Sequence, residues 1–173
     1  MSDKSMSEAA PVLFGEKLAS SEAFGVLFRE GMGLVEDTAA YLDGPGRQQS
    51  KQLDRAAALV YATESMRLTT RLMQLASWLL LHRAVNEGEM SLAQASKEKT
   101  KVKLSANEPT DAETTKILPD RLNELIEQSN ALLVKVRRLD ATIHAPVPSQ
   151  AVEENPLNRQ LGLLKAAFER DGR

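Results

Sequence analysis

The pattern of apolar and polar positions predicts one dominant helix, which extends from Ser50 to Asn86. This stretch contains neither Pro nor Gly, and it is rich in Leu, Met, Ala, Gln and Arg, which all favour helix. At about 100° per residue, its apolar positions fall on two opposite sides rather than on one. Because a helix that is apolar on both sides is buried on both, two sources of cover are expected.

The two apolar sides of this long helix differ in what we expect to cover them. The first side comprises Leu53, Ala57, Val60, Tyr61, Leu68, Leu72, Leu75, Trp78 and Leu79. Other helices of the same chain can cover it. The second side comprises Leu59, Ala62, Met66, Met73, Leu80 and Ala84. A second copy of the protein is the simplest cover there, so we predict a homodimer. Its predicted interface residues are Leu59, Ala62, Met66, Met73 and Leu80.

A helix with a single apolar side is predicted before the long helix. Ser20 or Ser21 can cap its first turn. Gly31 lies within its apolar stripe, where it can allow another helix to approach closely, but local plasticity is the simpler interpretation. The turn Asp43-Gly44-Pro45-Gly46-Arg47 ends this helix, since proline cannot continue it. The short connection predicts that the long helix returns antiparallel to it.

A third helix is predicted from Pro119, a residue that suits the first helical position. Its apolar residues fall on one narrow stripe between Leu118 and Ile143. Together the three helices predict an all-α fold over residues 20–144, an antiparallel three-helix bundle with a long central helix.

Three segments show no sustained helical pattern. Residues 1–19 form a largely polar N-terminal segment. Residues 89–117 are rich in Ser, Thr, Lys and Glu and predict a long flexible loop within the bundle domain, with one turn at most, around Leu92. Residues 145–173 contain three prolines and predict a flexible C-terminal tail.

The tail ends in a short amphipathic stretch that includes Leu161, Leu164 and Phe168. A helix this short is marginal in water. Two interpretations remain open: a frayed tail that docks weakly on its own body, or a tethered peptide that orders on a partner. The clustered apolar positions after a proline-rich spacer favour the second, with these three residues as partner-binding anchors.

Composition excludes several classes of protein. The 173 residues contain no cysteine, which rules out disulfides and fits a reducing compartment. A net charge of −2 gives no electrostatic footprint for nucleic acid. The longest apolar run is too short to cross a bilayer, and no secretory signal is visible at the start. We therefore expect a cytoplasmic protein that does not insert into a membrane.

Few residues are candidates for chemistry. The chain has two histidines, His82 and His144, too few for a metal cluster on their own. A four-helix di-iron site would need Glu-x-x-His pairs, which the sequence lacks. It also lacks a phosphate-binding loop and a nucleophile elbow. We therefore predict no catalytic residue, no cofactor, no metal site and no enzymatic activity.

One group of polar residues is unusual because it interrupts the first apolar side of the long helix. Glu64, Arg71 and His82 project into that side, and Arg67 flanks it. Glu64 and Arg67 are three residues apart and can pair within the helix. A polar cluster that fixes helix register is favoured over a catalytic Glu64, because no second titratable partner is apparent.

The amino-acid sequence of the central region resembles that of a known family. The relevant stretches are Tyr41-Leu42-Asp43-Gly44-Pro45-Gly46-Arg47, then Tyr61 to Thr70, Arg71 to Leu80, Arg83-Ala84-Val85 and Gly88-Glu89. They are similar to the regulator-of-CtrA-degradation (RcdA) family. The match is specific between Tyr41 and Glu89, and elsewhere it rests on the layout of helices, loop and tail.

This resemblance implies a dimeric three-helix bundle from an alphaproteobacterium. It also implies a non-enzymatic adaptor for the ClpXP protease in cell-cycle proteolysis. Such an adaptor joins ClpX after the response regulator CpdR has primed the unfoldase, and it delivers substrates directly or recruits a further adaptor. Recruitment to a cell pole together with the protease would follow.

Two rival functions stay open beside the adaptor. The first is a structural scaffold, a helical dimer with no direct role in delivery. The second is an enzyme with Glu64 as its base, which has little support because no partner for that carboxyl is apparent.

Overall fold

The computed structural model describes residues 21–99, 104 and 110–145. Within these residues the chain forms helices and no strand. The helices are α2 (Glu22–Asp43), α3 (Pro45–Ser50), α4 (Arg55–Asn86), α5 (Leu92–Lys99), α6 (Ala112–Ile117) and α7 (Asp120–Ile143). None of the helices in this part of the chain is long and apolar enough to cross a membrane.

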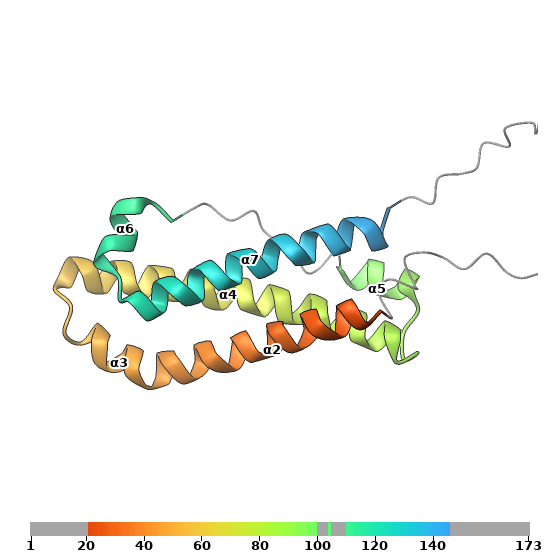
Figure 1. Cartoon of the computed structure of the whole chain (residues 1–173), viewed down its shortest axis with the longest axis horizontal. Coiled ribbons are helices and arrows are strands. Elements are labelled where there is room, and N and C mark those ends of the chain that lie inside the picture. Colours follow the sequence, from red (N-terminus) through yellow and green to blue (C-terminus); the bar gives the residue numbers. More distant parts are fainter. Residues whose placement is uncertain (1–20, 100–103, 105–109, 146–173) are drawn as a thin grey trace, which may run out of the picture.

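The three long helices α2, α4 and α7 lie side by side and pack against one another in every pairing (Figure 1). The predicted all-α three-helix bundle is confirmed. The core lies between these helices, and its fully buried side chains include Leu68, Leu75, Trp78, Leu122 and Leu132. The first apolar side of α4 therefore faces the core, as predicted.

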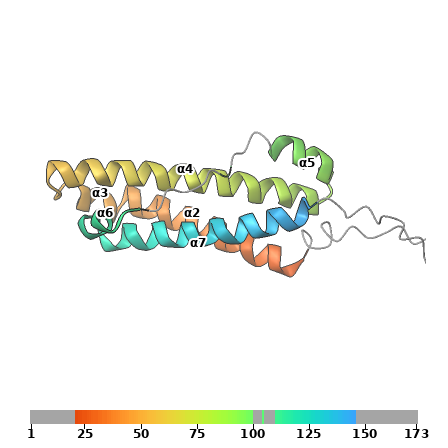
Figure 2. The ribbon, with the colours of Figure 1, turned by 90° about the horizontal axis from the view of Figure 1, so that it is seen from above.

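The direction of α7 differs from the prediction. Arg71, near the middle of α4, donates to Ser129 near the middle of α7, and Trp78, further along α4, donates to Asp140 near the end of α7. These pairs show that α7 runs parallel to α4 and antiparallel to α2 (Figure 2). The reason is that α5, which follows α4, lies at one end of the bundle, whereas α6, which precedes α7, lies at the other (Figure 1).

This connection contains more structure than the predicted flexible loop. Helix α5 lies at one end of the bundle and α6 at the other (Figure 1). In α5, Ala95 is fully buried, so contacts with the body stabilise a helix whose sequence is mostly polar. In α6, the Asp111 side chain caps the first turn by accepting from the Glu113 N–H at 2.7 Å.

The long helix begins later than the predicted Ser50. The carboxylate of Asp54 accepts from the Ala57 N–H at 2.8 Å and so caps α4, whose first residue is Arg55. The preceding residues form the separate short helix α3, which has Pro45 in its first turn. Proline at this point therefore ends α2 and begins another helix.

The start of α2 agrees with the sequence. Ser21 caps it by accepting from the Phe24 N–H. Gly31 is buried, and a Cβ at this position would collide with the Leu79 side chain of α4. The simpler interpretation of Gly31 as local plasticity is therefore wrong, and the structure supports close approach of a second helix.

Candidate functional site

The second apolar side of α4 is exposed in the single chain. The predicted interface residues Leu59, Met66, Met73 and Leu80 are 69, 72, 66 and 52% exposed, and Ala62 is exposed as well. Isolated exposed apolar residues are ordinary, but a line of large ones along one helix marks an interaction surface. We call this set the α4 outer face.

A groove of about 310 Å³ lies between α2 and α4 beside the outer face. Met73 belongs to both, and Val35, Leu42 and Ala76 add apolar lining. The buried Thr38 hydroxyl also lines the groove, and it has no hydrogen-bond partner among the described residues. A partner that covers the outer face would therefore meet a shallow, mostly apolar hollow whose polar lining residues are Thr38, Asp43 and Thr69.

The polar residues predicted to interrupt the first side of α4 are indeed buried. Glu64, Arg71 and His82 are 4, 5 and 0% exposed. One Glu64 oxygen pairs with Arg67 at 2.9 Å, as the spacing predicts, and the other accepts from the Thr110 hydroxyl at 3.3 Å. Each carboxylate oxygen has a partner from a different segment, so Glu64 ties the crossover connection to α4.

Arg71 crosses to the third helix. Its guanidinium donates to the Ser129 hydroxyl of α7, and that hydroxyl donates to the Ile126 carbonyl oxygen at 2.7 Å. Burial lowers the pKa of Arg71, and the nearby Glu64 carboxylate opposes this change. The arrangement fixes the register of α4 against α7, which is the structural role favoured by the sequence. The charged groups beside Glu64 are the guanidinium groups of Arg67 and Arg71.

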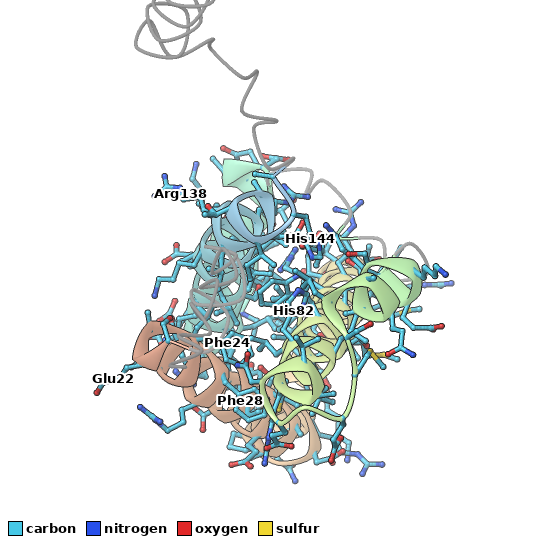
Figure 3. All side chains as sticks on the ribbon, turned by 90° about the vertical axis from the view of Figure 1, so that its right-hand side faces the viewer. Glu22, Phe24, Phe28, His82, Arg138 and His144 are labelled. Carbon is cyan, nitrogen blue, oxygen red and sulfur yellow. The ribbon has the colours of Figure 1, made fainter. Side chains whose placement is uncertain are left out.

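A second polar cluster was not predicted, and it lies at the other end of α4. His82 of α4 and His144, just after α7, have their Nε2 atoms 3.2 Å apart (Figure 3). The Asp140 carboxylate joins them, with Oδ1 3.6 Å from Nε2 of His144. The sequence signal for this cluster was the four-residue spacing of Asp140 and His144, which puts both on one helix face.

Several groups hold this cluster in place. The Trp78 indole stacks on the His82 ring at a centroid distance of 4.0 Å and donates to Asp140 at 2.8 Å. From α5, the Lys99 ammonium pairs with the second Asp140 oxygen at 2.6 Å. Burial lowers the pKa of both histidines, so the neutral imidazoles are favoured.

The predicted tail anchors Leu161, Leu164 and Phe168 lie outside the described residues. Their role therefore remains a prediction that rests on the sequence.

Comparison with known proteins identifies the family. The model of the family described as "Protein of unknown function (DUF1465)" matches residues 15–168. No curated protein matches the chain. Among solved structures, the crystal structure of RcdA from Caulobacter crescentus CB15 is 49% identical, with a TM-score of 0.61. The match covers 76% of this chain and 98% of the Caulobacter chain.

The fold, the central sequence and these comparisons agree. The chain therefore belongs to the DUF1465 family and, by its similarity to the Caulobacter protein, to the RcdA family.

Proposed function

We propose that the protein is a non-enzymatic adaptor in regulated proteolysis. The observation that carries this proposal is the 49% identity to RcdA over nearly the whole of that chain. In the proposed mechanism it binds the ClpX unfoldase after CpdR has primed it, in the cytoplasm and at a cell pole. It then brings cell-cycle substrates or a further adaptor to ClpXP.

The proposed working form is a homodimer that buries the α4 outer face. Its support is the line of large apolar side chains at Leu59, Met66, Met73 and Leu80, each more than half exposed in the single chain. A dimer would remove this surface from water, and burial of apolar area is favourable by about 25 cal/mol per Å². The groove beside Met73 would lie at the edge of the same interface.

In this proposal the C-terminal tail makes the contact with the protease. A tethered peptide raises the local concentration of its cargo, so that weak contacts suffice for delivery. The body of the protein would hold the cargo, while Leu161, Leu164 and Phe168 order on the partner.

A reconstituted primed protease tests the delivery role. We expect the full chain to increase the rate of cargo degradation, and truncation at Val147 to abolish that increase while helix content and dimerisation remain. Serine at the three anchor positions should have the same effect as the truncation. Full activity of the truncated protein would move the protease contact to the folded body. An unchanged rate with the full chain would favour the alternative, a structural scaffold.

Sedimentation tests the dimer. Met66→Glu and Met73→Glu place charges on the outer face, and each should convert the dimer to a monomer with native helix content. Val134→Glu is a matched control, since Val134 is 48% exposed but lies on α7. If both Met variants stay dimeric, the interface lies elsewhere.

A further inference from the structure

The cluster at the end of α4 contains three groups that commonly bind metal ions. These are the two imidazoles of His82 and His144 and the Asp140 carboxylate. They come from different elements, α4 and the end of α7, so the fold rather than local sequence brings them together (Figure 3). The proposed adaptor function makes no use of them, and they lie away from the α4 outer face.

Their spacing fits a tetrahedral ion. The three ligand atoms lie within 4.8 Å of one another. The two Nε2 atoms are 3.2 Å apart, and Nε2 of His144 is 3.6 Å from Oδ1 of Asp140. Zinc bonds of about 2.0–2.1 Å to nitrogen and oxygen place neighbouring tetrahedral ligands about 3.3 Å apart. Two of these separations match one ion directly, and closing the third pair from at most 4.8 Å to about 3.3 Å needs a shift of no more than about 1.5 Å.

The ring orientations also suit a metal. Nδ1 of His82 lies 3.0 Å from the Trp78 carbonyl oxygen, which can only accept, so Nδ1 carries the proton. The lone pair of His82 is therefore on Nε2, the atom that points toward His144. Nδ1 of His144 lies 3.0 Å from the Ser96 hydroxyl, whose oxygen can accept a hydrogen bond from Nδ1–H. Metal-binding histidines usually donate their other N–H to such a partner.

Two nearby charges have opposite effects on cation binding at the cluster. Asp140 supplies a negative charge, and its Oδ1 can bind an ion while it accepts from the Trp78 indole. The Lys99 ammonium, 2.6 Å from Oδ2, repels a second cation. The His144 and Asp140 side chains are 15 and 16% exposed, so the cluster is open to solvent on one side.

We propose that His82, Asp140 and His144 bind one divalent transition-metal ion of the zinc class, with water as the fourth ligand. Such an ion would fasten the end of α7 to α4. The competing explanation is a hydrogen-bonded chain from Ser96 through His144 to His82 that needs no metal.

Titration of the untagged full chain with Zn²⁺ tests the site, with Co²⁺ absorption as a second readout. The test is clean because the chain has two histidines and no cysteine. We expect one ion per chain, a rise in melting temperature with Zn²⁺, and a tetrahedral Co²⁺ spectrum. His144→Gln and Asp140→Asn should each weaken binding by more than about 100-fold, since even outer partners of metal ligands contribute 10–100-fold.

Lys99→Met is the decisive control. Removal of the competing ammonium should tighten metal binding by roughly tenfold at this separation. If the cluster is instead only a series of hydrogen bonds from Ser96 through His144 to His82, Lys99→Met would still bind no metal. Absence of saturation up to about 1 mM Co²⁺, in both the native chain and Lys99→Met, would overturn the proposal. Saturable binding that persists in the two folded ligand variants would overturn it as well, because the ion would then bind elsewhere.

Discussion

Leu75 and Leu80 lie on the same helix, but Leu75 is 1% exposed and Leu80 is 52% exposed. The side of α4 that carries Leu75 meets α2 and α7, whereas no described helix of the chain covers the α4 outer face. The buried side also contains Glu64, Arg71 and His82, while the outer face is apolar. Hydrophobicity alone therefore does not distinguish the two sides, and the position of the neighbouring helices does.

The comparison teaches that apolar side chains can be present on one helix for two reasons. On the inner side they build the core of a single chain. On the outer face they are available to a partner. The following experiments separate these two cases, beginning with the largest expected effect on stability.

The largest difference is expected between Leu75→Ala and Leu80→Ala. Loss of the buried Leu75 side chain leaves a cavity and should lower the free energy of unfolding by about 2–5 kcal/mol. Loss of the exposed Leu80 side chain should change the free energy of unfolding of the monomer by less than about 0.5 kcal/mol. Urea denaturation at low protein concentration measures both. Equal costs would show that the outer face is also covered within one chain.

A second pair of variants tests how closely α2 covers the inner side. Gly31→Ala places a methyl group against Leu79 and should destabilise the protein by about 1–3 kcal/mol. Gly33→Ala meets nothing within 4 Å, so its better helix propensity should stabilise the protein by up to about 1 kcal/mol. Thermal and urea denaturation should therefore show shifts of opposite sign. A neutral Gly31→Ala would mean that the two helices can separate without cost.

Much of this architecture could be predicted from the sequence because it depends on local periodicity. The spacing of Phe24, Leu27 and Leu34 was enough to place α2, and that of Leu122, Leu125 and Leu132 to place α7. The pair Glu64–Arg67 also followed from its three-residue separation.

What could not be predicted depends on contacts that are distant in the sequence. The parallel direction of α7 follows from a crossover whose course local spacing does not encode. Helix α5 depends on the burial of Ala95 against the body. The meeting of His82 with His144 likewise requires the relative register of α4 and α7, which was unknown before the direction of α7 was known.

A third pair of variants tests how much the buried polar residues of α4 contribute to stability. It compares Glu64, within α4, with Glu87, the C-cap of the same helix. Glu64→Gln removes the charge that compensates the buried Arg71 and should cost about 1–2 kcal/mol of stability. Glu87→Gln is the matched control, since the Arg83–Glu87 pair is about half exposed on both sides and should contribute less than 1 kcal/mol. Calorimetry of both variants measures the difference. Unchanged stability of Glu64→Gln with lost function would instead assign Glu64 to a site.

The smallest effect on the free energy of unfolding is expected at alkaline pH. There the pKa of Tyr41 indicates how well this end of the bundle core is shielded from water. Tyr41 of α2 is 5% exposed, and it donates to Gln49 at 2.8 Å. Burial, with a further contribution from the neighbouring Tyr61, raises the pKa of Tyr41 from 10.0 to about 12.

The sign of the pH effect follows from proton linkage. Because the folded state holds the Tyr41 proton more tightly than the unfolded state, the stabilisation is complete below pH 10 and is lost as the pH rises toward 12. Between pH 10 and 11 this loss amounts to roughly 1 kcal/mol. In Tyr41→Phe that part of the alkaline loss should be absent. The tyrosinate absorbance of the Tyr61→Phe variant, whose single tyrosine is Tyr41, should rise above pH 10, because burial still raises the pKa of Tyr41. It should rise at a lower pH than in the native chain, because the contribution of Tyr61 is lost. A midpoint near 10 would show that water reaches this end of the inner side, and the contrast between the two sides of α4 would be smaller there than at Leu75.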